Sequence, residues 1–167
     1  MCEGIPKWSL GGNHAHLSEG FFSFHGVDLG IVTWNVSTLG TVNKKIRGAR
    51  VSQIKQLVAR FPIVCLQEVR VSQTQLNFLF GDGPWLIHGF EAHGVGCTAF
   101  VINRKWLGKK SSRVEEVSAG RVSRLQIFDD NCCMRVWCIH NYGLEDAEVQ
   151  RISTLIEADF NLSLIHI

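Results

Sequence analysis

The sequence predicts a mixed α/β fold in which helices pack against a sheet. In the first half, short β-rich runs alternate with polar, amphipathic stretches. In the second half, several strand-like runs follow one another, joined by turns rich in glycine or lysine. A chain of 167 residues with 46% hydrophobic residues is long enough to bury one sizeable core and too short to suggest two.

The first sixty residues predict a leader, a strand and a helix. Residues 1–30 are rich in Gly, Ser and His without a clear period, so we expect a poorly defined leader. Residues 30–36 (GIVTWNV) have the composition of a strand. Residues 47–61 predict a helix that Pro62 ends. The apolar stripe of this helix consists of Val51, Ile54, Leu57 and Val58.

The middle of the chain predicts a buried strand, a short helix and a series of further strands. Residues 63–69 (IVCLQEV) form an almost unbroken apolar run, as expected for a strand covered on both faces. Residues 72–83 resemble a short helix that ends in glycine. The four strand-like runs that follow are residues 85–92, 96–103, 120–128 and 132–141.

The basic residues are concentrated in two segments, although the formal net charge is only +2. Residues 44–60 hold six basic residues and no acidic one, and residues 104–113 hold five more. Such patches neutralise phosphates and give affinity for nucleic acid, although a solvated helix face and a lysine-rich turn would have the same composition. The candidate nucleic-acid-binding residues are Lys44, Lys45, Arg47 and Arg50.

Targeting signals and cysteine chemistry are not indicated. No apolar run reaches the ~18 residues of a membrane helix, and the N-terminus lacks the pattern of a secretory signal. We therefore expect an intracellular protein, nuclear or cytoplasmic. The cysteines form no CxxC pair, so we expect buried thiols instead of zinc ligands or disulfides. They are Cys2, Cys65, Cys97, Cys132, Cys133 and Cys138.

Two polar residues lie where apolar strands are predicted to end. Asn35 ends the run IVTWN, and Glu68 follows the run IVCLQ. A carboxylate at the end of a buried strand needs a cation or several donors beside it. Carboxylate and amide oxygens suit Mg²⁺ or Mn²⁺, so both residues are candidate metal ligands. Alternatively, Asn35 turns the chain and Glu68 pairs with Arg70 or Lys55 at the surface.

The order of the sequence motifs resembles a known family. TWNV is followed about thirty residues later by IVCLQEV, and then by GVGCTAFVI, AGRVSRLQI and MRVWCIHN. In order and spacing, these motifs resemble the endonuclease/exonuclease/phosphatase superfamily, which includes DNase I-like nucleases, exonuclease III-type abasic endonucleases and LINE-type retrotransposon endonuclease domains. The resemblance covers residues 31 to about 141. It implies a four-layer α/β sandwich of the DNase I-like type, incomplete and limited to its N-terminal portion, over residues 31–161.

The same resemblance implies roles for individual residues. Asn35 and Glu68 would help to hold the catalytic Mg²⁺ or Mn²⁺. His140, at the end of VWCIH, stands where family members place a Tyr or His that contacts the scissile phosphate or assists proton transfer.

Two further catalytic candidates have open alternatives. Asn141 could donate to a phosphate oxygen or could turn the chain. Arg121 matches a Gly-Arg step of the family, and its guanidinium could clamp phosphate. A salt bridge from Arg121 to Glu115 or Glu116 is the alternative.

The C-terminal Asp-Phe-Asn triplet, Asp159 to Asn161, matches part of a family Gly-Asp-Phe-Asn motif. A strand over residues 152–158 would make Asp159 the family aspartate, but only about ten residues would connect it to His140. A helix over residues 146–160 is the favoured interpretation. It places Asp159 beside the apolar stripe, facing solvent.

The resemblance also implies that the catalytic set is incomplete. Relatives carry an Asp-His pair near the C-terminus, and this sequence contains no Asp-His dipeptide. We expect residues 162–167 to be a non-native tail. The chain is therefore predicted to be truncated and inactive as it stands.

The resulting hypothesis is a Mg²⁺-dependent phosphodiesterase, a DNA endonuclease of retrotransposon or abasic-site type. The alternatives are a non-catalytic nucleic-acid-binding fragment and a phosphatase of the same fold that acts on a lipid or sugar phosphate. Nucleic acid, with DNA favoured, is the expected partner. No membrane and no obligate protein partner is indicated.

Overall fold

A computed structural model describes most of the chain. The backbone is described for residues 9–10, 17–24, 27–37, 39–90, 97–130, 132–140, 143–160 and 164–166. Within these ranges, side chains are described from Leu29 to Asp159.

Six strands form the first sheet. In their order across the sheet they are β1 (Ser9–Leu10), β2 (Leu17–Phe24), β3 (Val27–Asn35), β4 (Ile63–Gln67), β6 (Ala99–Asn103) and β5 (Trp85–Gly89). Neighbouring strands pair antiparallel except for β3 and β4, which are parallel. The carboxyl ends of β3 and β4 therefore lie side by side where these two central strands end.

Four strands form the second sheet. In order they are β10 (Leu164–His166), β9 (Cys132–Ile139), β8 (Val122–Asp129) and β7 (Ser111–Ser118). The strands β7, β8 and β9 pair antiparallel, and β10 lies parallel to β9.

The two longer helices on the first sheet begin after residues with recognisable capping chemistry. Helix α1 (Lys44–Arg60) starts after Asn43, whose side chain accepts hydrogen bonds from the amides of Lys45 and Ile46. Helix α2 (Gln73–Phe80) starts with a capping box between Ser72 and Gln75. The remaining helices are the short α3 (Arg104–Leu107) and α4 (Asp146–Phe160). No helix in the described part of the chain is long and apolar enough to cross a membrane.

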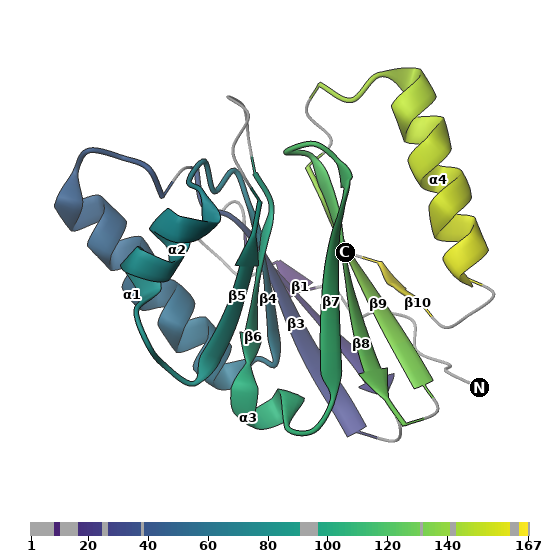
Figure 1. The fold of residues 1–167 in the computed structure, drawn as a ribbon, viewed down its shortest axis with the longest axis horizontal. Helices are drawn as coiled ribbons and strands as arrows, with labels where there is room; N and C mark the ends of the chain where they lie inside the picture. The colour runs from purple at the N-terminus through teal and green to yellow at the C-terminus, as the bar shows by residue number, and fades with distance from the viewer. Residues whose placement is uncertain are drawn as a thin grey trace.

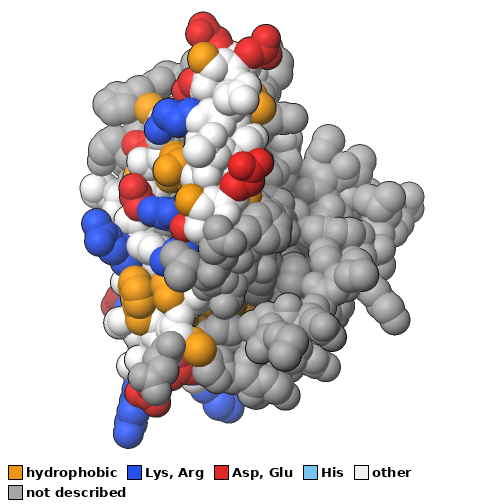
Figure 2. All heavy atoms as spheres, turned by 90° about the vertical axis from the view of Figure 1, so that its right-hand side faces the viewer, with side chains coloured by type: hydrophobic (Ala, Val, Ile, Leu, Met, Phe, Trp, Pro, Cys, Tyr) orange, Lys and Arg blue, Asp and Glu red, His pale blue; other side chains and the backbone are white. Residues whose placement is uncertain are grey.

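The elements stack in four layers, as Figure 1 shows. Helices α1 and α2 cover one face of the first sheet, the second sheet packs against its other face, and α4 covers the outer face of the second sheet. The side that carries α4 mixes acidic, basic and apolar side chains (Figure 2). The predicted four-layer α/β sandwich is confirmed.

A hydrophobic core fills each of the three spaces between layers. Ile54 and Leu57 of α1 pack on the first sheet, as the predicted helical stripe requires. Trp137 of β9 and Ile152 of α4 pack together outside the second sheet. Between the two sheets lie Leu29, Ile31, Ile63, Cys65, Phe100, Ile102, Leu125, Ile127, Met134, Val136 and Cys138. Cys65, Cys97 and Cys138 are buried free thiols, as predicted. The same prediction is wrong for Cys132, which is exposed, and for Cys133, which is only half-buried, because both lie at the start of the strand β9.

The structure corrects the prediction of a poorly defined leader over residues 1–30. Strands β1 and β2 and the start of β3 lie in this segment, and β2 pairs with β3 along its whole length. The ladder forms because β3 offers a partner edge, which the local composition of residues 17–24 does not reveal. Strand β7 and helix α3, which the local sequence pattern did not predict, lie in or beside the lysine-rich segment interpreted as a turn.

Candidate active site

Three predicted site residues come together where strands of both sheets end. Asn35 lies opposite Gln67 in the parallel ladder, so Glu68 emerges beside Asn35. His140 follows β9 directly and comes from the second sheet. The Gln67 side chain joins the two sheets at this point, because its Nε2 donates to the Ile139 carbonyl at 3.0 Å.

The carboxylate of Glu68 is the centre of this cluster. Asn35 Nδ2 donates to Glu68 Oε1 at 2.9 Å, and His140 Nε2 lies 3.2 Å from the same oxygen. Arg70 donates from an Nη atom to Glu68 Oε2 at 3.2 Å. The side chain of Glu68 is 21% exposed and that of His140 is 12% exposed, so the group is shielded and still reachable.

These contacts hold the pKa of Glu68 below its ordinary value. The main cause is the hydrogen bond from Asn35, and the charges of His140 and Arg70 act in the same direction. Partial burial opposes them. Glu68 is therefore ionised at neutral pH. Of the two surface partners considered for Glu68, Arg70 is the one observed, whereas the Lys55 ammonium lies over the Trp85 ring at 5.0 Å.

The backbone around the cluster adopts conformations that are rare for residues with side chains. Ser37, Glu68 and Arg70 have φ angles of 47°, 54° and 53°. Within the described ranges, Asp130 is the only other non-glycine residue with positive φ. Each such residue costs on the order of 1–3 kcal/mol, and this strain is typical of functional sites.

The donor set fits a divalent cation through Glu68. Its ionised carboxylate is the kind of hard oxygen ligand that Mg²⁺ and Mn²⁺ prefer. Over the described residues, no three His, Cys, Asp or Glu side chains cluster closely enough to hold a metal ion by themselves. Further ligands would have to be waters and substrate phosphate, which Mg²⁺ commonly uses.

Asn35 is oriented differently from the expected amide ligand. Its Oδ1 accepts a hydrogen bond from the Ser37 amide at 3.0 Å, so its nitrogen faces Glu68. In this arrangement Asn35 orients the carboxylate. It would serve as an oxygen ligand only after its side-chain amide rotated by about half a turn, which would exchange the positions of Oδ1 and Nδ2.

Arg121 lies next to His140 through its backbone. Its carbonyl accepts from the His140 amide at 2.8 Å, and its guanidinium lies against Gly143, where an added Cβ would come within 3.1 Å of an Nη atom. Of the acids considered as alternative partners, Glu115 pairs with Arg124 at 2.7 Å, and Glu116 accepts from the Gly120 amide. Asn141 lies outside the described residues.

Asp159 lies in a different part of the molecule. The predicted helix over residues 146–160 is confirmed as α4, but the prediction that Asp159 faces solvent is wrong. Its side chain is 9% exposed, because the last turn of α4 packs onto the outer face of the second sheet. There Asp159 contacts Arg124 at 3.0 Å, Arg135 at 3.4 Å and Trp137 Nε1 at 3.2 Å. Asn161 lies outside the described residues.

Basic residues lie exposed at the start of α1, and one further along the helix reaches the loop that follows Asn35. Lys44 and Lys45 are exposed in its first turn, where basic residues oppose the helix dipole and add to its positive end. Arg50 donates to the Ser37 carbonyl at 3.1 Å. Positive charge therefore extends from α1 to the loop that follows Asn35.

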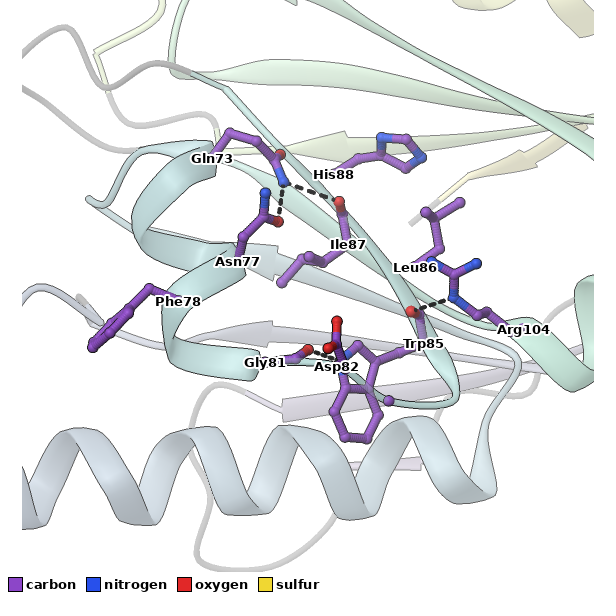
Figure 3. Close-up of a pocket in the computed structure, with 11 residues that line it drawn as sticks. Gln73, Asn77, Phe78, Gly81, Asp82, Trp85, Leu86, Ile87, His88 and Arg104 are labelled. Carbon is purple, nitrogen blue, oxygen red and sulfur yellow. Dashed lines mark hydrogen bonds between the residues drawn. The ribbon is translucent and has the colours of Figure 1, made fainter.

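A separate open cavity lies between α2 and β5 at the free edge of the first sheet (Figure 3). Side chains cap the exposed backbone there: Gln73 contacts Ile87 O and Gly89 N, and Arg104 Nε donates to Trp85 O at 2.8 Å. None of the predicted site residues lines this cavity. Its polar groups protect a sheet edge from pairing with another strand.

No family model and no curated protein matches the sequence. TDP2 from D. rerio, complexed with a single-strand DNA product, superposes with a TM-score of 0.56 and 17% identity, over 83% of this chain and 58% of that chain. The catalytic domain of APE2 from Xenopus laevis superposes with a TM-score of 0.53 and 16% identity, over 81% of this chain and 56% of that chain. The AP endonuclease LMAP from Leishmania major superposes with a TM-score of 0.52 and 16% identity, over 77% of this chain and 44% of that chain.

The chain has the DNase I-like fold. At this identity the likeness concerns the fold alone. The chain spans about half the length of the solved chains that it matches. The incomplete form of the DNase I-like sandwich predicted from the motifs agrees with this coverage.

Two contributors to the site escaped the sequence analysis as functional residues. Gln67 joins the sheets, and Arg70 holds the carboxylate of Glu68. The available signal for Gln67 was a polar residue within an apolar run. The available signal for Arg70 was a basic residue two positions after a candidate ligand. Neither signal is specific without the DNase I-like arrangement of the two sheets.

Proposed function

We propose that the chain carries part of the site of a divalent-cation-dependent phosphodiesterase that acts on nucleic acid, with DNA favoured. The observation that carries this proposal is the ionised Glu68, held by Asn35, His140 and Arg70 where strands of two sheets end. The fold supports it, and one solved protein of the same fold is complexed with a single-strand DNA product. A DNA endonuclease of retrotransposon or abasic-site type is the specific activity proposed.

Each residue of the cluster has a chemical task in this proposal. Glu68 would bind Mg²⁺ or Mn²⁺, which when bound supplies positive charge for the phosphate oxygens. Asn35 keeps the carboxylate ionised and oriented. His140 Nε2, at 3.2 Å from Glu68 Oε1, is placed to hold or move a proton at the phosphate. Arg121 and Asn141 are proposed as additional phosphate contacts.

Binding of the cation provides the first test. We expect the full chain to bind Mn²⁺, measured by electron paramagnetic resonance, and Glu68→Gln to weaken this binding at least about tenfold, because the carboxylate is the one acidic ligand assigned. Unchanged Mn²⁺ binding by Glu68→Gln would sink the proposed metal site.

Binding of DNA provides the second test. Fluorescence anisotropy with a labelled duplex should show salt-dependent binding that weakens by more than about tenfold when Lys44, Lys45, Arg47 and Arg50 are changed to Gln. Glu68→Gln should not weaken it. We expect little or no Mg²⁺-dependent nicking of plasmid DNA by this chain, because the described residues assign a single carboxylate to the site.

A non-catalytic nucleic-acid-binding role is the second candidate. The observation that favours it is the lack of a three-ligand metal cluster over the described residues. DNA binding without any Glu68-dependent Mn²⁺ binding would favour this candidate. Release of phosphate from a phosphomonoester would instead favour a phosphatase of the same fold.

A further inference from the structure

Arg70 and Glu68 form an ion pair whose two members differ in exposure. An Nη atom of Arg70 lies 3.2 Å from Glu68 Oε2, and the Arg70 side chain is 50% exposed against 21% for Glu68. Asn35 and His140 both contact the other oxygen, Oε1. The Arg70 guanidinium therefore occupies the carboxylate oxygen that the neighbouring site residues leave open.

Backbone hydrogen bonds of the residue between Glu68 and Arg70 hold this ion pair in place. Val69, between the two charged residues, is fully buried. Its amide donates to the Cys97 carbonyl at 2.9 Å, and its carbonyl accepts from the Leu39 amide at 2.9 Å. Because Val69 is held on both sides, the left-handed conformations of Glu68 and Arg70 aim both side chains at the same open surface.

The chemistry of the pair makes it exchangeable. A guanidinium presents five N–H donors in a fork that fits phosphate, and within the described part of the chain Arg70 uses one of them, on Glu68. A divalent cation and a guanidinium both seek the same carboxylate oxygen. A cation on Oε2 would release Arg70, whose exposed side chain could then take up a phosphate oxygen.

We propose that Arg70 is a phosphate-binding residue that shares Glu68 with the cation, so that it competes with the cation for Oε2 and binds nucleic acid when released. This inference rests on the proposed function, because it requires Glu68 to be a cation ligand. It assigns to Arg70 a role distinct from that of the basic residues of α1, which attract phosphate without touching Glu68.

Two binding assays on the full chain test the proposal. Arg70→Gln should bind Mn²⁺ about threefold more tightly than the wild type, since a partly exposed competing ion pair is removed. In Mn²⁺, the same variant should bind a labelled DNA duplex about fivefold more weakly, with a salt slope reduced by about one, and the loss should be smaller in EDTA, where Arg70 stays on Glu68. Arg151→Gln is the matched control, because it removes the same charge from α4, where the Arg151 guanidinium donates to the Val117 carbonyl at 2.9 Å. Circular dichroism melts verify that the variants fold.

A double-mutant cycle isolates the sharing of Glu68. In EDTA, Glu68→Gln should strengthen DNA binding about threefold by releasing Arg70, and the gain should vanish when Arg70→Gln is also present. A gain of equal size in both backgrounds would overturn the proposal. Arg70→Lys should keep part of the DNA affinity, because it keeps the charge and loses the fork.

The outcomes separate this inference from the proposed function. Mn²⁺ binding that depends on Glu68 but is the same in Arg70→Gln and Arg151→Gln would overturn the inference alone. Weaker DNA binding by Arg70→Gln with unchanged Mn²⁺ affinity would make Arg70 an ordinary phosphate contact and would also overturn it. Mn²⁺ binding that Glu68→Gln leaves unchanged would overturn the proposed metal site, and the competition with it.

Discussion

Glu68 and Asp159 are two carboxylates with similar partners and different surroundings. Each contacts arginine and a ring nitrogen: Arg70 and His140 for Glu68, and Arg124 and Trp137 for Asp159. Glu68 lies on a strained turn at the end of β4, and its arginine is half exposed. Asp159 lies on regular helix, 9% exposed, and its two arginines are 18% and 15% exposed.

The difference shows that similar partners can leave two carboxylates in very different surroundings. Asp159 pairs with two half-buried guanidinium groups and fastens the end of α4 to the second sheet, while Arg124 also pairs with Glu115 and lies over the Trp137 ring. A buried pair of this kind is costly to break, because the remaining charge stays desolvated. Glu68 keeps an exposed side and a partner that can leave. Its surroundings suit exchange of ligands.

The largest effect on stability is expected at Asp159. Asp159→Asn removes the negative charge beside Arg124 and Arg135 and should lower the free energy of unfolding by about 3 kcal/mol. Urea denaturation of the full chain, followed by circular dichroism, measures this change. Asp146→Asn is the control, because Asp146 is exposed in the first turn of α4. Equal unfolding midpoints for the two variants would show that Asp159 is not a structural anchor.

An intermediate effect is expected at Asn35. Asn35→Ala removes the hydrogen bonds to Glu68 Oε1 and from the Ser37 amide, and should cost about 1 kcal/mol of stability. It should also raise the pKa of Glu68 toward its ordinary value, because the Asn35 hydrogen bond is the main cause of the lowering. Side-chain carbon NMR during an acid titration reports this pKa. An unchanged titration midpoint would mean that Asn35 does not control the carboxylate.

The smallest effect is the pH dependence that Glu68 gives to stability. Its pKa is lower in the folded chain, so the ionised form stabilises the fold above the unfolded pKa of ~4.3. This contribution is lost as the pH falls through the lowered folded value. The difference in unfolding free energy between wild type and Glu68→Gln should therefore shrink as the pH falls below about pH 5. A difference that grew on acidification would contradict the assigned direction.

Most of the fold could be predicted because its elements carry strong local patterns. The stripe of α1, the unbroken apolar run of β4 and the acidic first turn of α4 each follow from spacing along the chain. The strands β2 and β7 were missed because each becomes a strand through its neighbour, β3 or β8, and not through its own composition.

The candidate site was predictable in part for the same reason. Glu68 and Asn35 stand at the ends of apolar runs, and parallel strands bring such ends together. Arg70 was considered only as a surface partner, because its position depends on positive φ angles at Glu68 and Arg70. Positive φ is usually predicted from a glycine, and neither residue is one.

The sequence by itself determined most of the helices and strands, and that a carboxylate stands at the end of a buried strand. Those features depend on residues close together in the chain. Only the tertiary structure decided the surroundings of each acid, because burial of Asp159 and access to Glu68 depend on segments far apart in sequence. Helical phase placed Asp159 beside the stripe of α4, but the packing of its last turn against Arg124 and Trp137 turned that position into the interior.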